Sequence, residues 1–261
     1  MPRLTRRLLR DFMRARAVQR WERLAREVDR MPLSSLRGLD DEARTLRRSL
    51  NRIVARSNAR LDIQRPGAEP LDLPAGTTWR WRPQLMAART SPRGIAAPEN
   101  GTRLAEEAAI WHDCPDRALI LRQMRNSRSA ELSPYGLLLE ILGFSGNFLS
   151  ISIDLPDAAL KGLTRSRIVR LASVISVERP MNIYARLNVG HGPNTDQLLR
   201  HLGDLQPGQT TSFVTEFDMY KIEMNEKRLE KIWLDLIFES PHMNAVRIGD
   251  LFLSHHQRAE V

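Results

Sequence analysis

Hydrophobic positions repeat along this chain with two different periods, and the period changes near Cys114. Between residues 39 and 61, apolar or small side chains recur at spacings of three and four, which is the repeat of one helical face. They are Leu39, Ala43, Leu46, Leu50, Ile53, Ser57 and Leu61. After Cys114, apolar and polar residues alternate, as in strands that bury one face. We therefore expect a helical N-terminal part and a β-rich remainder.

Residues 1–65 are predicted to form a pair of amphipathic helices. An earlier apolar stripe follows the same spacing: Met13, Ala17, Trp21, Leu24, Val28 and Met31. Residues 32–38 separate the two stripes, because proline does not continue a helix. Asp40 is the expected N-cap of the second helix, with more acidic residues in its first turn. The pattern fits a helical hairpin or one longer helix bent near Pro32.

Eight alternating segments are predicted to be strands, and turns containing Gly, Pro, Asn or Asp separate most of them. They are residues 117–125, 135–144, 148–155, 167–179, 182–189, 210–220, 231–239 and 245–255. Residues 77–82 add a short strand with Trp79 and Trp81 on one face, and residues 197–202 fit either a helix or a strand. No intervening helix is long enough for a parallel crossover, so we predict a mainly β fold. The most specific fold that we predict is an antiparallel, jelly-roll-like β-sandwich.

The segment 66–103 is predicted to be a linker that carries the first strand. It holds ten of the 29 Gly and Pro residues of the chain, a density that excludes helix and favours loops. The expected organisation is a basic helical segment at 1–65, the linker at 66–103 and the sandwich at 104–261. The sandwich can begin as early as residue 72.

The charge distribution changes the picture of the helical segment. Residues 1–65 contain eighteen arginines, no lysine and eight acidic residues, whereas the remainder of the chain is close to neutral. Three interpretations stay open: a solvated helical pair, self-association as a coiled coil, and attachment to an anionic surface. For attachment, a membrane surface is favoured over nucleic acid, because the charge accompanies an apolar stripe. The expected contact residues are Arg3, Arg6, Arg7, Arg10 and Arg14.

Composition and motifs argue against several classes of protein. The single cysteine, Cys114, excludes an internal disulfide framework and a cysteine-rich zinc site. Phosphate-binding, dinucleotide-binding and hydrolase motifs are absent, and the histidines are scattered, so we expect no cofactor, no metal and no catalysis. His255 and His256 are expected to be solvated. With no apolar signal segment, the expected location is the cytoplasm, peripheral to the inner membrane if the helices bind lipid.

A polar strand face is the candidate ligand-binding site. In residues 182–189 the odd positions are apolar and face the core, which leaves the even positions on the other face. In residues 231–239 an aromatic and an acidic residue face outward in the same way. Amides and guanidinium groups bind sugar hydroxyls, while aromatic rings stack on sugars. If both strands share a sheet, a shallow groove results from Asn182, Tyr184, Arg186, Asn188, Trp233 and Asp235. The alternative is a solvated face, or one covered by the helices.

The C-terminal stretch resembles a known kind of domain. Residues 231–257, KIWLDLIFESPHMNAVRIGDLFLSHHQ, are similar to the closing strands of jelly-roll carbohydrate-binding and galactose-binding-like domains. Asp235, Pro241 and the run IGDL at 248–251 carry the likeness. The motifs IWHDC (110–114), FDMY (217–220), NEKR (225–228) and HMNAVR (242–247) make the whole chain resemble an uncharacterised bacterial family from alphaproteobacteria. The first resemblance implies a glycan-binding sandwich, and the second implies no activity.

Together these observations predict a non-catalytic binding or scaffolding protein. In this hypothesis the sandwich recognises a glycan or a protein, and the arginine-rich helices contact an anionic surface or self-associate into a homo-oligomer. One alternative is a carbohydrate-active or metal-dependent hydrolase built on the sandwich. A second alternative is an N-terminal arm that binds nucleic acid.

Overall fold

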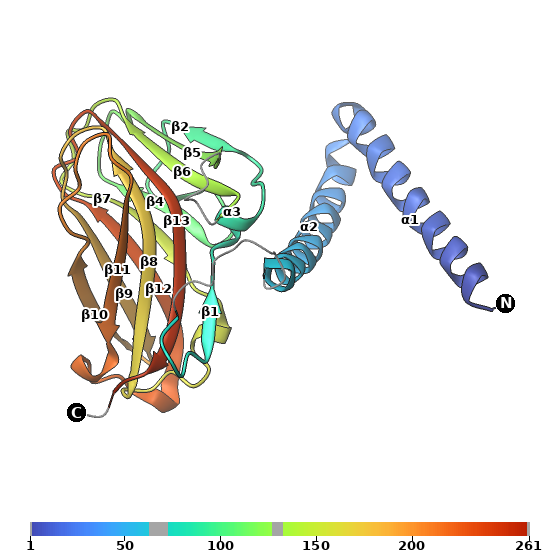
Figure 1. Cartoon of the computed structure of the whole chain (residues 1–261). Coiled ribbons are helices and arrows are strands. Elements are labelled where there is room, and N and C mark those ends of the chain that lie inside the picture. The colour runs from blue at the N-terminus through green and yellow to red at the C-terminus, as the bar shows by residue number, and fades with distance from the viewer. Residues whose placement is uncertain (1, 63–72, 127–132, 260–261) are drawn as a thin grey trace. The chain divides into compact units, whose positions relative to one another are not determined.

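The computed structural model describes residues 2–62, 73–126 and 133–259 (Figure 1). In the helices, side-chain environments are described for residues 13–50 and 53, apart from 14 and 48. The chain divides into two compact units, residues 1–54 and 55–261. The first is helical and the second contains the β-sandwich, so the predicted fold class is confirmed.

Two long helices form the N-terminal part. They are α1 (Pro2–Glu27) and α2 (Leu33–Asp62), joined through a short 3-10 turn. The expectation that Asp40 caps the second helix is wrong. The helix already begins at Leu33, with the Pro32 carbonyl accepting its first hydrogen bonds. Asp40 instead pairs with Arg44 one turn further on, at 2.6 Å.

The helices α1 and α2 meet near the turn and then diverge (Figure 1). Near the turn, Arg20 Nη2 lies 3.5 Å from Glu42 Oε2. Six apolar residues in this region are half-buried: Trp21, Leu24, Met31, Leu36, Leu39 and Ala43. Further along α2 the apolar residues of the same helical face are exposed to solvent: Leu46, Leu50 and Ile53 are 40%, 60% and 62% exposed. Neither helix, over the part that is described, contains a stretch apolar enough to cross a membrane.

The sandwich consists of two antiparallel sheets. The first has the order β11-β8-β13-β6-β5-β2, and β1 pairs with the C-terminal half of β13. Its strands are β1 (Trp79–Trp81), β2 (Gly94–Ala96), β5 (Leu119–Arg125), β6 (Tyr135–Ile141), β8 (Arg167–Val177), β11 (Thr211–Asp218) and β13 (Asn244–Gln257). The second has the order β10-β9-β12-β7-β4-β3. Its strands are β3 (Thr102–Arg103), β4 (Ala108–His112), β7 (Leu149–Asp154), β9 (Ile183–His191), β10 (Asn194–His201) and β12 (Leu229–Phe238).

The connections give the sandwich its jelly-roll character. From β6 to β9, and again from β10 to β13, each strand is followed by a strand of the other sheet. Alternate residues of each strand are buried between the sheets, as in β7, where Leu149, Ile151 and Ile153 are fully buried. This alternation is the pattern from which the strands were predicted, because successive side chains point to opposite faces.

The segment 66–103 contains more structure than its Gly and Pro content predicts. Besides β1, its described residues include β2, β3 and the one-turn helix α3 (Gln84–Ala87). The expected exclusion of helix is therefore wrong for one turn. Leu85 and Met86 are fully buried, and Gln123 Nε2 donates to the Leu85 carbonyl at 2.6 Å. Burial and this buried amide hold the turn in place although a single helical turn is too short to be stable by itself.

The strand β13 is buried along nearly its whole length. It runs to Gln257 with β8 on one side and β1 on the other, so His255 and His256 are 1% and 7% exposed. The expectation that these two histidines are solvated is wrong for this reason. Trp79 stacks on His255 with ring centroids 5.4 Å apart. Trp79 and Trp81 pack against the hydrophobic core, as their shared face indicates.

We expect His255 to make folding sensitive to acid. Burial lowers the pKa of His255 to about 4, and the positive charge of Arg167 acts in the same direction. The unfolded chain takes up this proton near its ordinary pKa of about 6.5, so stability falls as the pH drops from there towards 4. Between pH 7 and 4, wild type should lose up to about 3 kcal/mol more than H255F in urea unfolding. Identical pH profiles would contradict this expectation.

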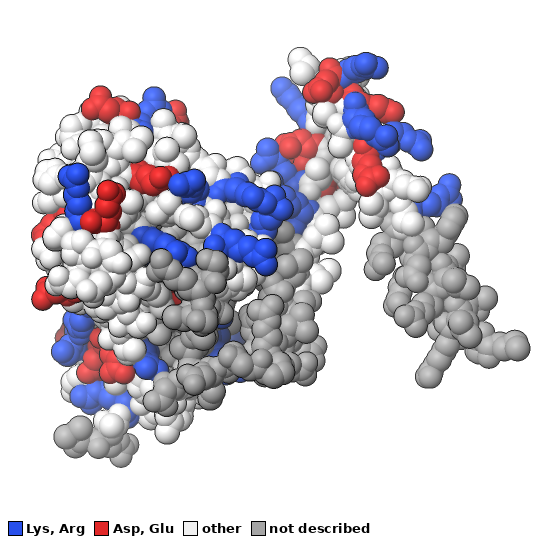
Figure 2. Space-filling model, turned by 45° about the horizontal axis from the view of Figure 1, so that its top comes forward, with Lys and Arg blue, Asp and Glu red and all other residues white. Residues whose placement is uncertain are grey.

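Charges on the sandwich largely compensate one another. On the side of the sandwich that it shows, Figure 2 displays basic and acidic side chains interspersed. Arg122 Nε lies 2.9 Å from Glu140 Oε2, and Arg82 Nε lies 2.9 Å from Asp250 Oδ1. The first pair is exposed and the second is buried, so only the second is expected to matter strongly for stability.

Candidate ligand-binding site

The two strands that carry the predicted site residues are neighbours in the second sheet. In the β9–β12 ladder Asp235 lies opposite Arg186 and Trp233 lies opposite Asn188. The strands β7 and β4 continue the sheet on the far side of β12. We call the solvent side of these four strands the outer face. Its members are Tyr184, Arg186, Asn188, Lys231, Trp233, Asp235, Ile237, Ser150, Ser152, Asp154, Ala109 and Trp111.

A buried carboxylate organises the centre of the outer face. Asp235 Oδ2 accepts hydrogen bonds from Arg186 Nε (3.1 Å), Arg186 Nη2 (2.9 Å) and Asn188 Nδ2 (2.9 Å). Asp235 is only 5% exposed, so this charge is stabilised by the adjacent guanidinium and amide rather than by water. The Arg186 side chain remains 35% exposed. Its remaining N–H groups are therefore held in place at a surface that a ligand can reach.

Asn188 plays a different part from the one its position predicts. It is 1% exposed, and its Nδ2 also lies 3.2 Å from the Arg186 carbonyl oxygen. The amide therefore supports Asp235 from below instead of facing solvent. Its Oδ1 is buried and, among the described residues, has no hydrogen-bond donor. A buried acceptor without a donor is energetically costly.

Trp233 lies beside Lys231, which shares a carboxylate with Arg103. Lys231 Nζ is 4.7 Å from the Trp233 ring centroid, a cation–π contact. The same ammonium lies 3.1 Å from Asp154 Oδ1, and Arg103 Nη2 lies 3.1 Å from Asp154 Oδ2. A ligand that stacks on this side of Trp233 must therefore meet Lys231 first.

A third aromatic residue on the outer face was not predicted from the sequence. Trp111, in β4, is 42% exposed and lies opposite Ser150 in the β4–β7 ladder. Tyr184 occupies the same row of the sheet three strands away, about 14 Å at the usual strand spacing. Ser150 and Ile237 lie between Trp111 and Tyr184 in this row. The alternation of buried Ile110 and His112 around Trp111 is the signal that would have revealed it.

The remaining predicted residues lie elsewhere or are not described. Asn182 precedes β9 and donates to Glu239 Oε2 at 2.7 Å, at the end of the strand pair. Tyr184 contacts the ring of His201, with centroids 5.1 Å apart. The structure thus brings five of the six predicted side chains together, and their role in binding stays a prediction. The side chains of the five predicted N-terminal arginines lie outside the described residues: Arg3, Arg6, Arg7, Arg10 and Arg14.

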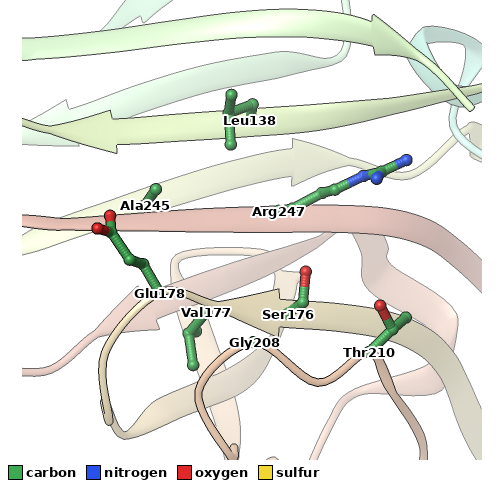
Figure 3. Close-up of a pocket in the computed structure, with 8 residues that line it drawn as sticks. All are labelled: Leu138, Ser176, Val177, Glu178, Gly208, Thr210, Ala245 and Arg247. Atoms are coloured by element: carbon green, nitrogen blue, oxygen red, sulfur yellow. The ribbon is translucent and has the colours of Figure 1, made fainter.

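Two surface hollows lie away from the outer face. One, of about 310 Å³, lies over the first sheet, and Figure 3 shows Glu178 and Arg247 at opposite ends of it. Its lining is Leu138, Ser176, Val177, Glu178, Gly208, Thr210, Ala245 and Arg247. None of these is aromatic, so this hollow offers no surface for stacking on a sugar ring. The second hollow, of about 440 Å³, lies around His112 and Cys114.

Near Cys114, the ring of His112 is held by hydrogen bonds to the backbone. His112 Nδ1 accepts the Cys114 N–H at 3.2 Å, so Nε2 carries the proton and donates to the Pro98 carbonyl at 3.0 Å. Both ring nitrogens are thus occupied. Burial alone would raise the pKa of the Cys114 thiol, but hydrogen bonds from Ser145 bring it below its usual value. Among the described residues no three His, Cys, Asp or Glu side chains are grouped to hold a metal ion.

Comparison with known proteins places the chain in a family. The family of unknown function DUF6478 matches residues 1–261, and the chain belongs to it. No curated protein matches the sequence. Similar solved structures include a family 11 carbohydrate-binding module of Clostridium thermocellum in complex with a β-1,3-1,4-mixed-linked tetrasaccharide. That match has a TM-score of 0.41 and 9% identity, and covers 62% of this chain and 96% of that one.

Two further structures show the same low level of likeness. The CBM22-1 xylan-binding domain of Paenibacillus barcinonensis Xyn10C gives a TM-score of 0.38 at 9% identity, covering 64% of this chain and 94% of that one. The enzymatically active domain of tailspike protein 4 from bacteriophage CBA120 gives 0.41 at 8% identity, covering 60% of this chain. The match spans only 21% of the tailspike chain. These values assign no ligand to the present chain.

Proposed function

We propose that this member of the DUF6478 family binds a saccharide on the outer face of its second sheet. The observation that carries the proposal is the combination of aromatic rings with a prearranged polar network. Trp111, Tyr184 and Trp233 provide apolar ring surfaces, and Arg186 is held by buried Asp235 at 2.9 Å. Sugars require both kinds of contact, rings for their C–H faces and fixed donors for their hydroxyls.

The same contacts favour binding over hydrolysis. Glycoside hydrolysis uses two carboxyl groups, one of which must be able to donate a proton. On the outer face, Asp235 is held by Arg186 and Asn188, and Asp154 is held by Arg103 and Lys231. Both carboxylates are thus engaged by neighbouring basic or amide side chains. The hydrolase alternative therefore has no support from this face.

The experiment is an oligosaccharide array probed with the full chain, followed by titration calorimetry of each saccharide that binds. The proposal expects at least one class of saccharide to bind saturably with a negative heat-capacity change, from burial of ring surface. A full chain that binds no saccharide, but binds a protein through the same face, would replace this proposal with the protein-recognition interpretation.

For the helical part we propose self-association through α2. The seam Leu46, Leu50 and Ile53 is exposed and follows the 3.5-residue repeat of coiled coils. The charges along α2 favour a second copy of this helix as the partner that covers the seam. In the sequence, α2 is acidic at residues 40–42 and basic at residues 44, 47, 48, 52, 56 and 60. Two antiparallel copies that meet at this seam place the acidic residues 40–42 of one copy near the basic later half of α2 of the other, whereas an anionic lipid surface repels the acidic residues.

This proposal predicts the behaviour of two matched variants of the full chain. In sedimentation equilibrium we expect wild type and L33E to be dimeric, because Leu33 is exposed but lies outside the seam. The double variant L46E/L50E should be monomeric, because four carboxylates then face one another in the dimer. A monomeric wild type at tens of micromolar overturns the proposal. Salt-sensitive binding of that monomer to phosphatidylserine vesicles would support membrane attachment instead.

A further inference from the structure

Two basic side chains share one carboxylate at the edge of the outer face near Trp233. Asp154 accepts ion pairs from both Lys231 and Arg103, at 3.1 Å each. The single carboxylate of Asp154 therefore pairs with two basic side chains. Arg186 does not change the balance, because Asp235 neutralises it separately. The region around Trp233 thus has the charge and the donors to hold one more carboxylate.

These ion pairs are of the exchangeable kind. The side chains of Arg103, Lys231 and Asp154 are 51%, 56% and 29% exposed. Pairs with this much access to water contribute little to stability and are readily replaced by a competing partner. A ligand carboxylate can therefore take the place of Asp154 on Lys231 without disturbing the fold.

The position of Lys231 distinguishes charged from neutral saccharides. Its ammonium lies 4.7 Å from the Trp233 ring centroid, where a sugar would stack. A neutral sugar must displace the ammonium and gains no ionic contact in return. A sugar with its own carboxylate keeps Lys231 as a partner while its ring contacts Trp233. The same side chain therefore opposes one class of ligand and favours the other.

From this arrangement we infer that the saccharide is acidic and carries a carboxylate, as in glycans that contain uronic acids. The inference rests on the proposed saccharide site and specifies its ligand class. The carboxylate lies between Lys231 and Arg103, and the ring lies against Trp233. Arg186 donates to hydroxyl groups of the neighbouring sugar.

The test compares each uronic-acid oligosaccharide that binds on the array with its methyl ester, which differs only in charge. Calorimetry with the full chain should show the acid binding at least tenfold more tightly at low salt. The difference should shrink as salt is added, because exposed charges are screened. An ester that binds as tightly as the acid overturns the acidic-ligand inference but leaves the saccharide site standing. If no saccharide of either kind binds, the proposed function itself fails.

Single substitutions locate the effect. We expect K231Q to weaken binding of the acid about tenfold and to leave binding of the ester unchanged or stronger, because the Trp233 ring is then uncovered. D154N should strengthen binding of the acid, since the competing carboxylate is removed. K161Q is the matched control, because Lys161 is an exposed lysine outside the outer face. Equal losses in K231Q and K161Q would contradict the assigned position of the carboxylate.

Discussion

Replacing Asp250 by Ala is expected to lower the free energy of unfolding by about 3 kcal/mol, the range found for breaking a buried ion pair. Arg82 Nε and Nη2 donate to the two carboxylate oxygens of Asp250 at 2.9 and 3.0 Å. The two side chains are only 13% and 4% exposed, so the variant leaves a guanidinium largely without water or a partner. The pair also joins the end of β1 to β13, which otherwise share a ladder of only three residues.

Urea unfolding of the full chain measures this effect, and two further variants give its cause. R82M/D250L should recover most of the loss, because no uncompensated charge remains. E140A removes the partner of Arg122, whose ion pair has side chains 48% and 27% exposed, and should cost less than about 1 kcal/mol. If D250A and E140A lower the free energy of unfolding equally, burial of the Arg82–Asp250 pair is not the cause of the loss.

The double variant W111A/W233A is expected to bind the array-selected saccharide about 100-fold more weakly, which corresponds to about 2.7 kcal/mol. Each ring supplies apolar surface at low entropic cost, and Trp residues dominate many binding sites for this reason. Neither ring belongs to the core. Trp111 is 42% exposed and Trp233 is half-buried on the outer face, so the variant should still fold.

Calorimetry on the full chain provides the measurement, and an aromatic residue elsewhere provides the control. Tyr220 is 59% exposed and follows β11 of the first sheet, where its ring contacts Arg165 and Arg258. Y220A removes an exposed ring of comparable type and should bind as wild type does. A W111A/W233A protein that folds and keeps the wild-type affinity would contradict the placement of the ligand on the outer face.

Strand positions were predictable because burial of one face imposes alternation on the sequence. All eight predicted segments contain a strand, and the ambiguous residues 197–202 fall largely in β10. The two-residue β3, the three-residue β2 and the five-residue β4 were missed, because so few residues show little or no period. The one-turn helix α3 depends on a distant amide, that of Gln123, which local sequence cannot reveal.

The sequence predicts which side chains of the candidate site face outward, but not which of them contact one another. Alternation places Arg186 and Asp235 on the outward side of their strands, yet it does not say which strands are neighbours. Only the β9–β12 pairing joins these two residues across 49 positions of sequence and buries the carboxylate. The Lys231 ammonium over Trp233 likewise follows from the local path of β12, where a bulge precedes Lys231. Pairing and bulges depend on the whole sheet, so no short pattern predicts them.

The central claim is that the outer face of the second sheet binds the saccharide, and the tryptophan indoles test it most directly. The chain has five tryptophans, of which only Trp111 and Trp233 lie on the outer face. In nitrogen-15 NMR spectra of the full chain, titration with the array-selected saccharide should shift the indole N–H signals of these two. The signals of Trp21, Trp79 and Trp81 should stay in place. If calorimetry reports binding while only those three signals move, or none moves, the ligand binds elsewhere and the account is wrong.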